Sequence, residues 1–314
     1  MTDFTIAICT YNGAKRFPEV LDRLKSQVGI ETVSWEVLLV DNNSTDNTAE
    51  AFQTYQATWS RAIPLKYCFE PQQGAGYARK LAIRKAQSDL VGFLDDDNLP
   101  ESGWVAAALA FAEQYPKAGA FGSQIHGLYE TPPPPELQGL LPFLAIVERG
   151  SRPLRYEPAQ KLLPPSAGLV VRKQAWLATV PERCILNGRT QDSMLTGEDL
   201  EVISYIQQGG WEIWYNPAME MYHKIPTSRL QREYLIPFFQ GIGLSRHVTR
   251  MLSVQPAYRP LATIAYAAND LRKIAKHLLK YGPSVRTDLK AACEMELFRS
   301  SLLSPLYIRQ QNPR

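Results

Sequence analysis

The sequence LVGFLDDD at residues 90–97 decides the fold, because a short apolar run leads directly into three consecutive aspartates. A continuous apolar run of this length is typical of a strand that is buried on both faces of a sheet. Three like charges at the end of such a strand are costly unless a positive charge lies beside them. The stretch therefore predicts a central parallel strand with a charged site at its carboxyl end.

Three similar apolar runs come before this strand, at residues 4–9, 35–40 and 65–69. Stretches with helical spacing of apolar residues separate the runs, at residues 17–24, 49–59 and 77–87. Buried strands that alternate with helices indicate βαβ units, hence an α/β fold with a mostly parallel sheet and helices on both faces. Ligands of such sheets bind beyond the carboxyl ends of the strands.

Polar residues stand at three of these ends: Thr10, Tyr11 and Asn12 after the first run, Asp41 after the second, and Asp95, Asp96 and Asp97 after the fourth. Hard divalent cations take carboxylate oxygens and bridge to diphosphate oxygens. Alternation along an extended chain would place Asp95 and Asp97 on the same side, so that one holds a ribose and the other the cation. The competing interpretations are a helix N-cap cluster before Pro100 and, for Asp41, a simple turn residue.

A glycine loop at residues 73–76 precedes the helix that carries Arg79. The loop is not a dinucleotide fingerprint, because that pattern should follow the first strand, and a glycine pair can be only a tight turn. Arg79 could reach a diphosphate or a base through charge-assisted hydrogen bonds, or it could belong to a solvated helix face.

Two more candidates lie further along the chain. A turn at Gly197 followed by helical spacing predicts a helix that begins near Glu198. Asp199, in the first turn, could be a general base for an acceptor hydroxyl, or it could only complement the helix dipole. His223 follows a strand-like run at residues 211–215 and could be structural or a nitrogen ligand of a cation.

Taken in order, these segments resemble the family 2 glycosyltransferases with the GT-A fold, in particular those of bacterial exopolysaccharide synthesis. The resemblance extends over roughly residues 4–225 and rests on IAICTYN at 6–12, VDNNSTD at 40–46, GYAR at 76–79, FLDDD at 93–97 and GED at 197–199. It implies a Rossmann-like, mostly parallel sheet of GT-A type with a helical C-terminal extension. It also implies a donor nucleotide site formed by Thr10, Tyr11, Asn12, Asp41, Arg79, Asp95 and Asp96.

The same resemblance implies a chemistry. The cofactor, a divalent cation (Mn²⁺ or Mg²⁺), would be bound by Asp97, Asp95 and His223. Asp199, supported by Glu198, would be the base of a single displacement that inverts the anomeric carbon. The sugar would move from a nucleoside-diphosphate sugar, with a UDP-sugar favoured, to a hydroxyl of a glycan or lipid-linked glycan. The sequence departs from the family at Lys80, where Asn is frequent.

Length, charge and cysteine spacing argue against nucleic-acid-binding, zinc-binding and membrane-spanning proteins. A length of 314 residues with 45% hydrophobic side chains suits one large α/β domain with or without an extension, and a net charge of +3 gives no support for nucleic acid as a partner. The four cysteines lie far apart without zinc-type spacing, which favours reduced core thiols. No leader pattern or apolar stretch of about 20 residues is present, so we expect a cytoplasmic protein.

The prolines at residues 132–135 predict a boundary. We expect a glycosyltransferase domain at 1–225, with a nucleotide-sugar half at 1–130 and an acceptor half at 131–225. Residues 226–314 form a basic, mainly helical extension with 14 Lys and Arg against 5 Asp and Glu. A helix at 261–280 either packs its apolar face on the core or docks on anionic lipid at the inner face of the membrane.

Two rival functions compete with the transferase. A sugar-nucleotide nucleotidyltransferase would carry a glycine-rich triphosphate loop with Lys or Arg after the first strand, where this chain has Thr10 to Gly13. A catalytically inactive nucleotide- or glycan-binding module of the same fold would be expected to have lost at least one of Asp95, Asp97 and Asp199. Both alternatives are therefore disfavoured.

Overall fold

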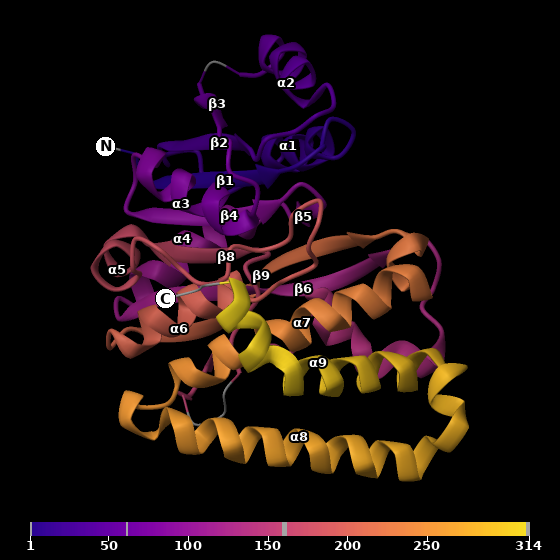
Figure 1. Cartoon of the computed structure of the whole chain (residues 1–314). Helices are drawn as coiled ribbons and strands as arrows, with labels where there is room; N and C mark the ends of the chain where they lie inside the picture. The colour runs from indigo at the N-terminus through magenta and orange to yellow at the C-terminus, as the bar shows by residue number, and fades with distance from the viewer. Residues whose placement is uncertain (1, 61, 159–161, 312–314) are drawn as a thin grey trace. The chain divides into compact units, whose positions relative to one another are not determined.

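The computed structural model describes residues 2–60, 62–158 and 162–311, and its backbone forms two compact units (Figure 1). The sheet unit comprises Met1–Leu128, Pro142–Glu182 and Tyr205–Lys224. The helical unit comprises Tyr129–Leu141, Arg183–Ser204 and Ile225–Arg314.

Four parallel strands form the first half of the sheet unit. They are β1 (Phe4–Thr10), β2 (Trp35–Asp41), β3 (Leu65–Phe69) and β4 (Leu90–Asp95), in the spatial order β3-β2-β1-β4. Every residue of β1 and β2 is buried, as the continuous apolar runs predict. In the parallel register, Thr10 of β1 stands beside Asp41 of β2, so the carboxyl ends of these strands meet at one edge.

Helices connect these strands and cover the sheet: α1 (Phe17–Lys25), α2 (Thr48–Ala57), α3 (Ala75–Lys85) and α4 (Trp104–Gln114). In α1, the residues Phe17, Val20, Leu21 and Leu24 recur at helical spacing and are all buried. A proline in the first turn of α1 fits the position where a backbone N–H has no partner within the helix. The α/β architecture expected from the sequence is confirmed.

The second half of the sheet is antiparallel where it joins the first. The strands are β5 (Asn98–Pro100), β6 (Ala118–Tyr129), β7 (Leu154–Arg155), β8 (Leu169–Arg172) and β9 (Glu212–Ile225), with helix α5 (Lys173–Thr179) after β8 and a 3₁₀ segment at Pro135–Leu144. Strand β8 pairs antiparallel with β4, and β5 pairs antiparallel with β9. Strand β9 extends ten residues beyond the predicted run at 211–215 and so includes His223, which lies opposite Asn98.

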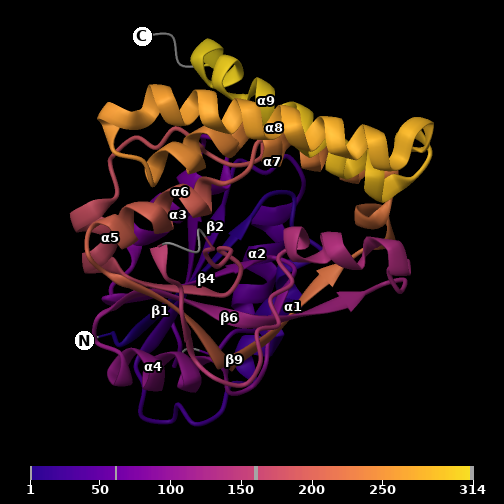
Figure 2. The same cartoon turned by 90° about the horizontal axis from the view of Figure 1, so that it is seen from below.

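The helical unit contains the start of α6 (Glu198–Gln208) and three long helices, α7 (Arg232–Leu252), α8 (Arg259–Tyr281) and α9 (Leu289–Gln311), with 3₁₀ turns at Thr227–Leu230, Pro256–Tyr258 and Gly282–Arg286. Both views show α8 running alongside α9 (Figures 1 and 2). Helices α7 and α9 approach closely because Gly243 faces Ser300: a Cβ at Gly243 would lie 2.6 Å from the Cβ of Ser300. Among the residues that the structure describes, no helix is long and apolar enough to cross a membrane.

Candidate active site

The three aspartates after β4 lie in a tight turn rather than in an extended segment. Asp95 is the last residue of β4, Asp96 and Asp97 form the turn, and β5 begins at Asn98. Helix α4 begins only at Trp104, so the N-cap interpretation of the aspartates is wrong. The alternation of an extended chain does not apply to Asp95 and Asp97 either, because the turn interrupts it.

Each of the three carboxylates has a different partner, and Asp96 has the most. Asp96 is 7% exposed and accepts a hydrogen bond of 2.5 Å from Oγ1 of Thr10. Arg16 donates to both carboxylate oxygens, from Nε at 2.8 Å and from Nη2 at 2.9 Å, and Nη2 also donates to the backbone oxygen of Tyr11. Burial raises the pKa of Asp96, while the hydrogen bond from Arg16 acts in the opposite direction. Arg16, which the sequence analysis missed, therefore joins the end of β1 to the aspartate turn.

Asp97 faces His223 of β9. Oδ1 of Asp97 lies 3.6 Å from Nε2 of His223, and both residues are 7% exposed. Nδ1 of His223 lies 2.9 Å from the backbone oxygen of Leu144. A carbonyl oxygen can only accept, so Nδ1 is the donor and carries the hydrogen. In the neutral ring, Nε2 then presents its lone pair towards Asp97, which is how metal-binding histidines are oriented.

Asp95 is paired with Arg79. Nη2 of Arg79 lies 3.3 Å from Oδ1 of Asp95, and Arg79 is only 5% exposed although it stands on helix α3. Arg84, on the same helix, is exposed and forms an ion pair with Glu182. The solvated-face interpretation is thus wrong for Arg79, which belongs to the aspartate cluster, and holds for Arg84.

Asn12 connects the loop after β1 to the loop after β2. Its φ of 52° lies in the left-handed region, which Asn tolerates better than most residues. Its Oδ1 accepts the backbone N–H groups of Thr45 at 2.8 Å and Asp46 at 3.2 Å, and its own N–H donates to Oγ of Ser44. The amide oxygen therefore organises the two loops.

Asp41 is 2% exposed at the end of β2. Its carboxylate accepts the N–H of Ser44 at 2.9 Å and the hydroxyl of Tyr67 at 2.5 Å. Burial and the neighbouring Asp41 both raise the pKa of Tyr67, so the hydroxyl stays a donor. A contact of Asp41 with a nucleobase stays a prediction.

Asn98 holds the aspartate turn in shape and was also missed. It is fully buried, its Oδ1 accepts the N–H of Asp95 at 2.9 Å, and its Nδ2 donates to Oδ1 of Asp97 at 3.1 Å. Its place directly after three aspartates was the signal that could have found it, since Asn side chains commonly bond to nearby backbone groups in turns.

Gly13 allows the β1 end and the aspartate turn to approach each other. A Cβ at this position would lie 1.8 Å from Oγ1 of Thr10 and 2.4 Å from Oδ2 of Asp96. No side chain fits there without moving the Thr10–Asp96 hydrogen bond.

Asp199 and Glu198 lie in the first turn of α6, within the helical unit. In the same unit, the buried carboxylate of Glu201 accepts the N–H groups of Ile185 at 3.0 Å and Leu186 at 2.7 Å, which anchors the preceding loop to α6. The predicted donor-site residues and His223 all belong to the sheet unit. The candidate base and the candidate donor site are thus carried by different units.

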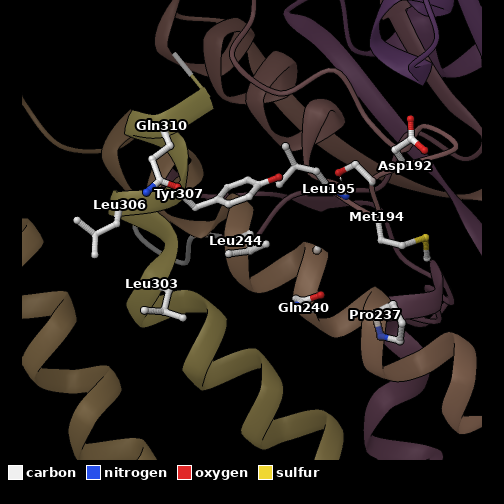
Figure 3. Close-up of a pocket in the computed structure, with 12 residues that line it drawn as sticks. Asp192, Met194, Leu195, Pro237, Gln240, Leu244, Leu303, Leu306, Tyr307 and Gln310 are labelled. Carbon is white, nitrogen blue, oxygen red and sulfur yellow. Dashed lines mark hydrogen bonds between the residues drawn. The ribbon is translucent and has the colours of Figure 1, made fainter. Parts of the chain in front are cut away.

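A cavity of about 510 Å³ also lies within the helical unit (Figure 3). It is lined by residues 192–195, α7 and the end of α9, and its apolar contributors include Met194, Leu244 and Leu303. The predicted site residues do not line it. One of the segments that line the cavity, residues 192–195, comes shortly before Glu198 and Asp199 in the chain.

The residues at the aspartate turn fit a divalent cation that is shared with a ligand. Across the described ranges, no group of three or more His, Cys, Asp or Glu side chains is arranged to hold a metal ion. Asp97 and His223 offer one carboxylate and one imidazole nitrogen, whereas Asp95 faces Arg79. Mg²⁺ and similar ions are often held by one or two protein ligands together with phosphate oxygens and water. The pair suits that arrangement.

Comparison with known proteins agrees with this fold. A segment of 115 residues is 28% identical to poly(ribitol-phosphate) beta-N-acetylglucosaminyltransferase TarS of Staphylococcus aureus, and it covers 37% of this chain and 20% of that protein. The chain thus spans only about a fifth of that relative. Among solved structures, residues 1–349 of S. aureus TarS superimpose with a TM-score of 0.54 at 17% identity, covering 99% of this chain and 92% of that one.

A second solved structure is the mannosyltransferase PcManGT of Pyrobaculum calidifontis, with a TM-score of 0.60 at 18% identity over 96% of this chain and 89% of that one. At these identities the two superpositions show the fold alone, which is that of GT-A glycosyltransferases. Residues 5–169 match the model of the family described as glycosyl transferase family 2. Because that match covers more than half of the chain, the chain belongs to glycosyl transferase family 2.

Proposed function

We propose that the chain transfers a sugar from a nucleoside-diphosphate sugar to an acceptor hydroxyl, with inversion at the anomeric carbon. The observation that carries the proposal is the meeting of polar groups at the carboxyl ends of β1, β2 and β4. There, Asp96 is bonded to Thr10, and Asp97 faces His223. This edge is where ligands of parallel α/β sheets bind, which supports placing the donor nucleotide there.

The proposed reaction is a single displacement. The acceptor oxygen forms a bond to the anomeric carbon while the bond from that carbon to the diphosphate oxygen breaks, and the diphosphate leaves with the electron pair. Asp199 takes the proton of the acceptor hydroxyl, with Glu198 beside it in the same helical turn. No covalent intermediate with the protein is formed.

The leaving diphosphate carries negative charge that must be stabilised in the transition state. A divalent cation, Mn²⁺ or Mg²⁺, held by Asp97 and His223 would neutralise that charge when bound. Arg79 stands beside Asp95 and would orient the donor through charge-assisted hydrogen bonds. Thr10, Tyr11, Asn12 and Asp41 would bound the nucleotide pocket.

Two similar proteins guide the choice of donor. TarS is named for N-acetylglucosaminyl transfer and one of its structures contains UDP-GlcNAc, whereas the PcManGT structure contains GDP-Man and Mn²⁺. We favour a UDP-sugar and keep GDP-sugars as the second choice. Both complexes support a nucleotide sugar as the donor class.

The proposed acceptor is a glycan or a lipid-linked glycan. The helical unit carries the candidate base and the mainly apolar cavity, which suits an acceptor with an apolar part. Residues 226–314, with their excess of Lys and Arg, would bring the protein to a membrane that holds such an acceptor.

Thermal unfolding with UDP, GDP, dTDP and CDP, each with Mn²⁺, Mg²⁺ or a chelator, tests the donor site. A ligand at 100 times its Kd adds roughly 2.7 kcal/mol to stability, so the true donor base should stand out. Release of that nucleoside diphosphate from its sugar conjugate then tests transfer. Stabilisation without any release would favour an inactive binding module, and pyrophosphate release from a nucleoside triphosphate and a sugar phosphate would favour a nucleotidyltransferase.

A further inference from the structure

Helix α8 turns its apolar side chains towards solvent. An amphipathic helix on a protein surface normally packs its apolar face against the core. In α8 the opposite holds, because the large apolar side chains are among the most exposed of the chain: Leu261 (68%), Ile264 (68%), Leu271 (55%), Leu278 (49%) and Leu279 (87%). The core-packing interpretation of this helix is therefore wrong.

The inner face of α8 is polar. Asp270 is fully buried and accepts two hydrogen bonds from Arg250 of α7, at 2.6 and 2.9 Å. His277 is 6% exposed, and its Nε2 donates to the backbone oxygen of Ala291 at 2.8 Å. Rotating α8 to hide its leucines would break a buried ion pair, which is strongly unfavourable. The outward direction of the apolar face is thus fixed by specific contacts within the helical unit.

Basic side chains border the exposed leucines. Arg272, Lys276 and Lys280 are exposed and follow one another at intervals of four residues, so they form a row along one side of the apolar face. Tyr258, 60% exposed, stands just before the helix. An apolar face flanked by Lys and Arg, with an aromatic residue at one end, has the composition of helices that lie in the membrane interface.

We propose that the exposed face of α8 docks on an anionic lipid bilayer, with the leucines among the acyl chains and the basic row on the lipid phosphates. At 23 residues, α8 would lie along about 35 Å of membrane surface. The proposal names the surface that makes the membrane contact in the proposed function. The docking itself does not depend on that function, and only its purpose, which is access to a lipid-linked acceptor, rests on it. A second copy of the chain is the less favoured occupant, because two such faces would bring two rows of like charge together.

Flotation of full-length protein with phosphatidylglycerol–phosphatidylcholine vesicles, and with pure phosphatidylcholine vesicles, tests the docking. A triple substitution Leu271→Ser, Leu278→Ser and Leu279→Ser removes apolar contact and leaves the buried pair in place. A second variant, with Arg272→Gln, Lys276→Gln and Lys280→Gln, removes the charges. Leu177→Ser, at an equally exposed leucine of α5 in the sheet unit, is the matched control.

We expect salt-sensitive binding of the wild type to anionic vesicles, and a loss of vesicle affinity of roughly tenfold or more in each triple variant. The control should bind as the wild type does, and unfolding temperatures should show that all variants fold.

The proposal is overturned if the wild type does not bind anionic vesicles, or if the leucine variant binds them equally well. Analytical ultracentrifugation gives a second test. If the wild type self-associates while the leucine variant is monomeric, and both bind vesicles equally well, the exposed face is an interface between two copies and the proposal is overturned. Nucleotide-dependent stabilisation is measured in parallel, because its failure would contradict the proposed function and leave the lipid contact standing.

Discussion

Nε2 of His223 lies 3.6 Å from Oδ1 of Asp97, although 126 positions separate the two residues in the chain. The pairing of β5 with β9 brings them together, because His223 stands opposite Asn98, the residue after Asp97. The hydrogen bond from Nδ1 to Leu144 fixes the ring, so that Nε2 faces the carboxylate. Asp97 at the end of the turn and His223 on β9 are therefore the two side chains that the proposed function assigns to the cation.

His223→Gln is predicted to weaken the effect of Mn²⁺ on nucleotide binding by roughly 10-fold or more, because loss of even a group that only supports a metal ligand typically costs about 10- to 100-fold. The measurement is a Mn²⁺ titration of the unfolding temperature at a fixed concentration of the stabilising nucleotide. His126→Gln is the control, because His126 lies in the same unit and its ring contacts Glu148 at the surface. An unchanged Mn²⁺ requirement in His223→Gln would remove His223 from the ligand set.

Arg16→Gln is predicted to lower the free energy of unfolding by about 1–3 kcal/mol, because it leaves the buried Asp96 without its two guanidinium hydrogen bonds. The side chain of Arg16 is 46% exposed, so water would replace part of the loss and the lower half of that range is expected. Urea denaturation measures the change. Arg23→Gln is a matched control, since Arg23 is similarly exposed and faces Glu101 at 3.9 Å; a loss as large as that of Arg16→Gln would contradict the prediction.

Gly13→Ala is predicted to abolish nucleotide-dependent stabilisation, because the new Cβ would displace the hydrogen bond between Thr10 and Asp96. Overpacking of this kind also costs about 1–3 kcal/mol of stability. Gly103→Ala is the control, since a Cβ at Gly103 meets no atom within 4 Å. Equal nucleotide responses of the two variants would show that the close approach at Gly13 has no role in the site.

The parallel half of the fold could be predicted from the sequence because its signals are local. Each of β1 to β4 is a continuous apolar run, and each ends within a residue of the predicted position. The antiparallel half could not be predicted in this way. Pairs such as β4 with β8 join segments about 80 residues apart, and the local pattern of one segment does not identify the strand with which it pairs. The second half of β9 does carry a strand signal, because Met219, Met221, His223 and Ile225 are buried and alternate with more exposed residues, but the expected run ended at Tyr215.

The candidate site likewise has features that the sequence predicts and features that it does not. The polar residues at the strand ends were predictable from their positions, whereas Arg16 was not, because its bond to Asp96 spans 80 residues and Arg16 lies outside every apolar run. The direction of α8 was also beyond the sequence. The spacing of its leucines is equally compatible with packing on the core and with exposure, and the buried Arg250–Asp270 pair decides between them.

Asp270→Asn is predicted to lower the free energy of unfolding by about 3 kcal/mol or more, because it leaves the partly buried Arg250 without its counter-charge. The change is measured as a shift in the urea midpoint. Asp22→Asn removes an exposed carboxylate that faces Lys25 at 3.6 Å and keeps an oxygen that can accept the hydroxyl of Tyr55, so it should change stability by less than about 0.5 kcal/mol. Similar small shifts in both variants would mean that the buried pair does not fix the rotation of α8.

Asp199→Asn is predicted to reduce turnover by roughly 10²- to 10⁴-fold, the usual effect of losing a general base, because an amide cannot take the proton of the acceptor hydroxyl. Donor binding should stay close to that of the wild type, since Asp199 is not among the proposed donor-binding residues. Turnover with the donor found by thermal unfolding, together with the nucleotide-dependent shift of the same variant, separates the two effects. Glu233→Gln, at an exposed glutamate of α7 that does not line the cavity, controls for loss of a negative charge in the helical unit. Full activity of Asp199→Asn would assign the base to another carboxylate, and Glu198→Gln is then the next variant to measure.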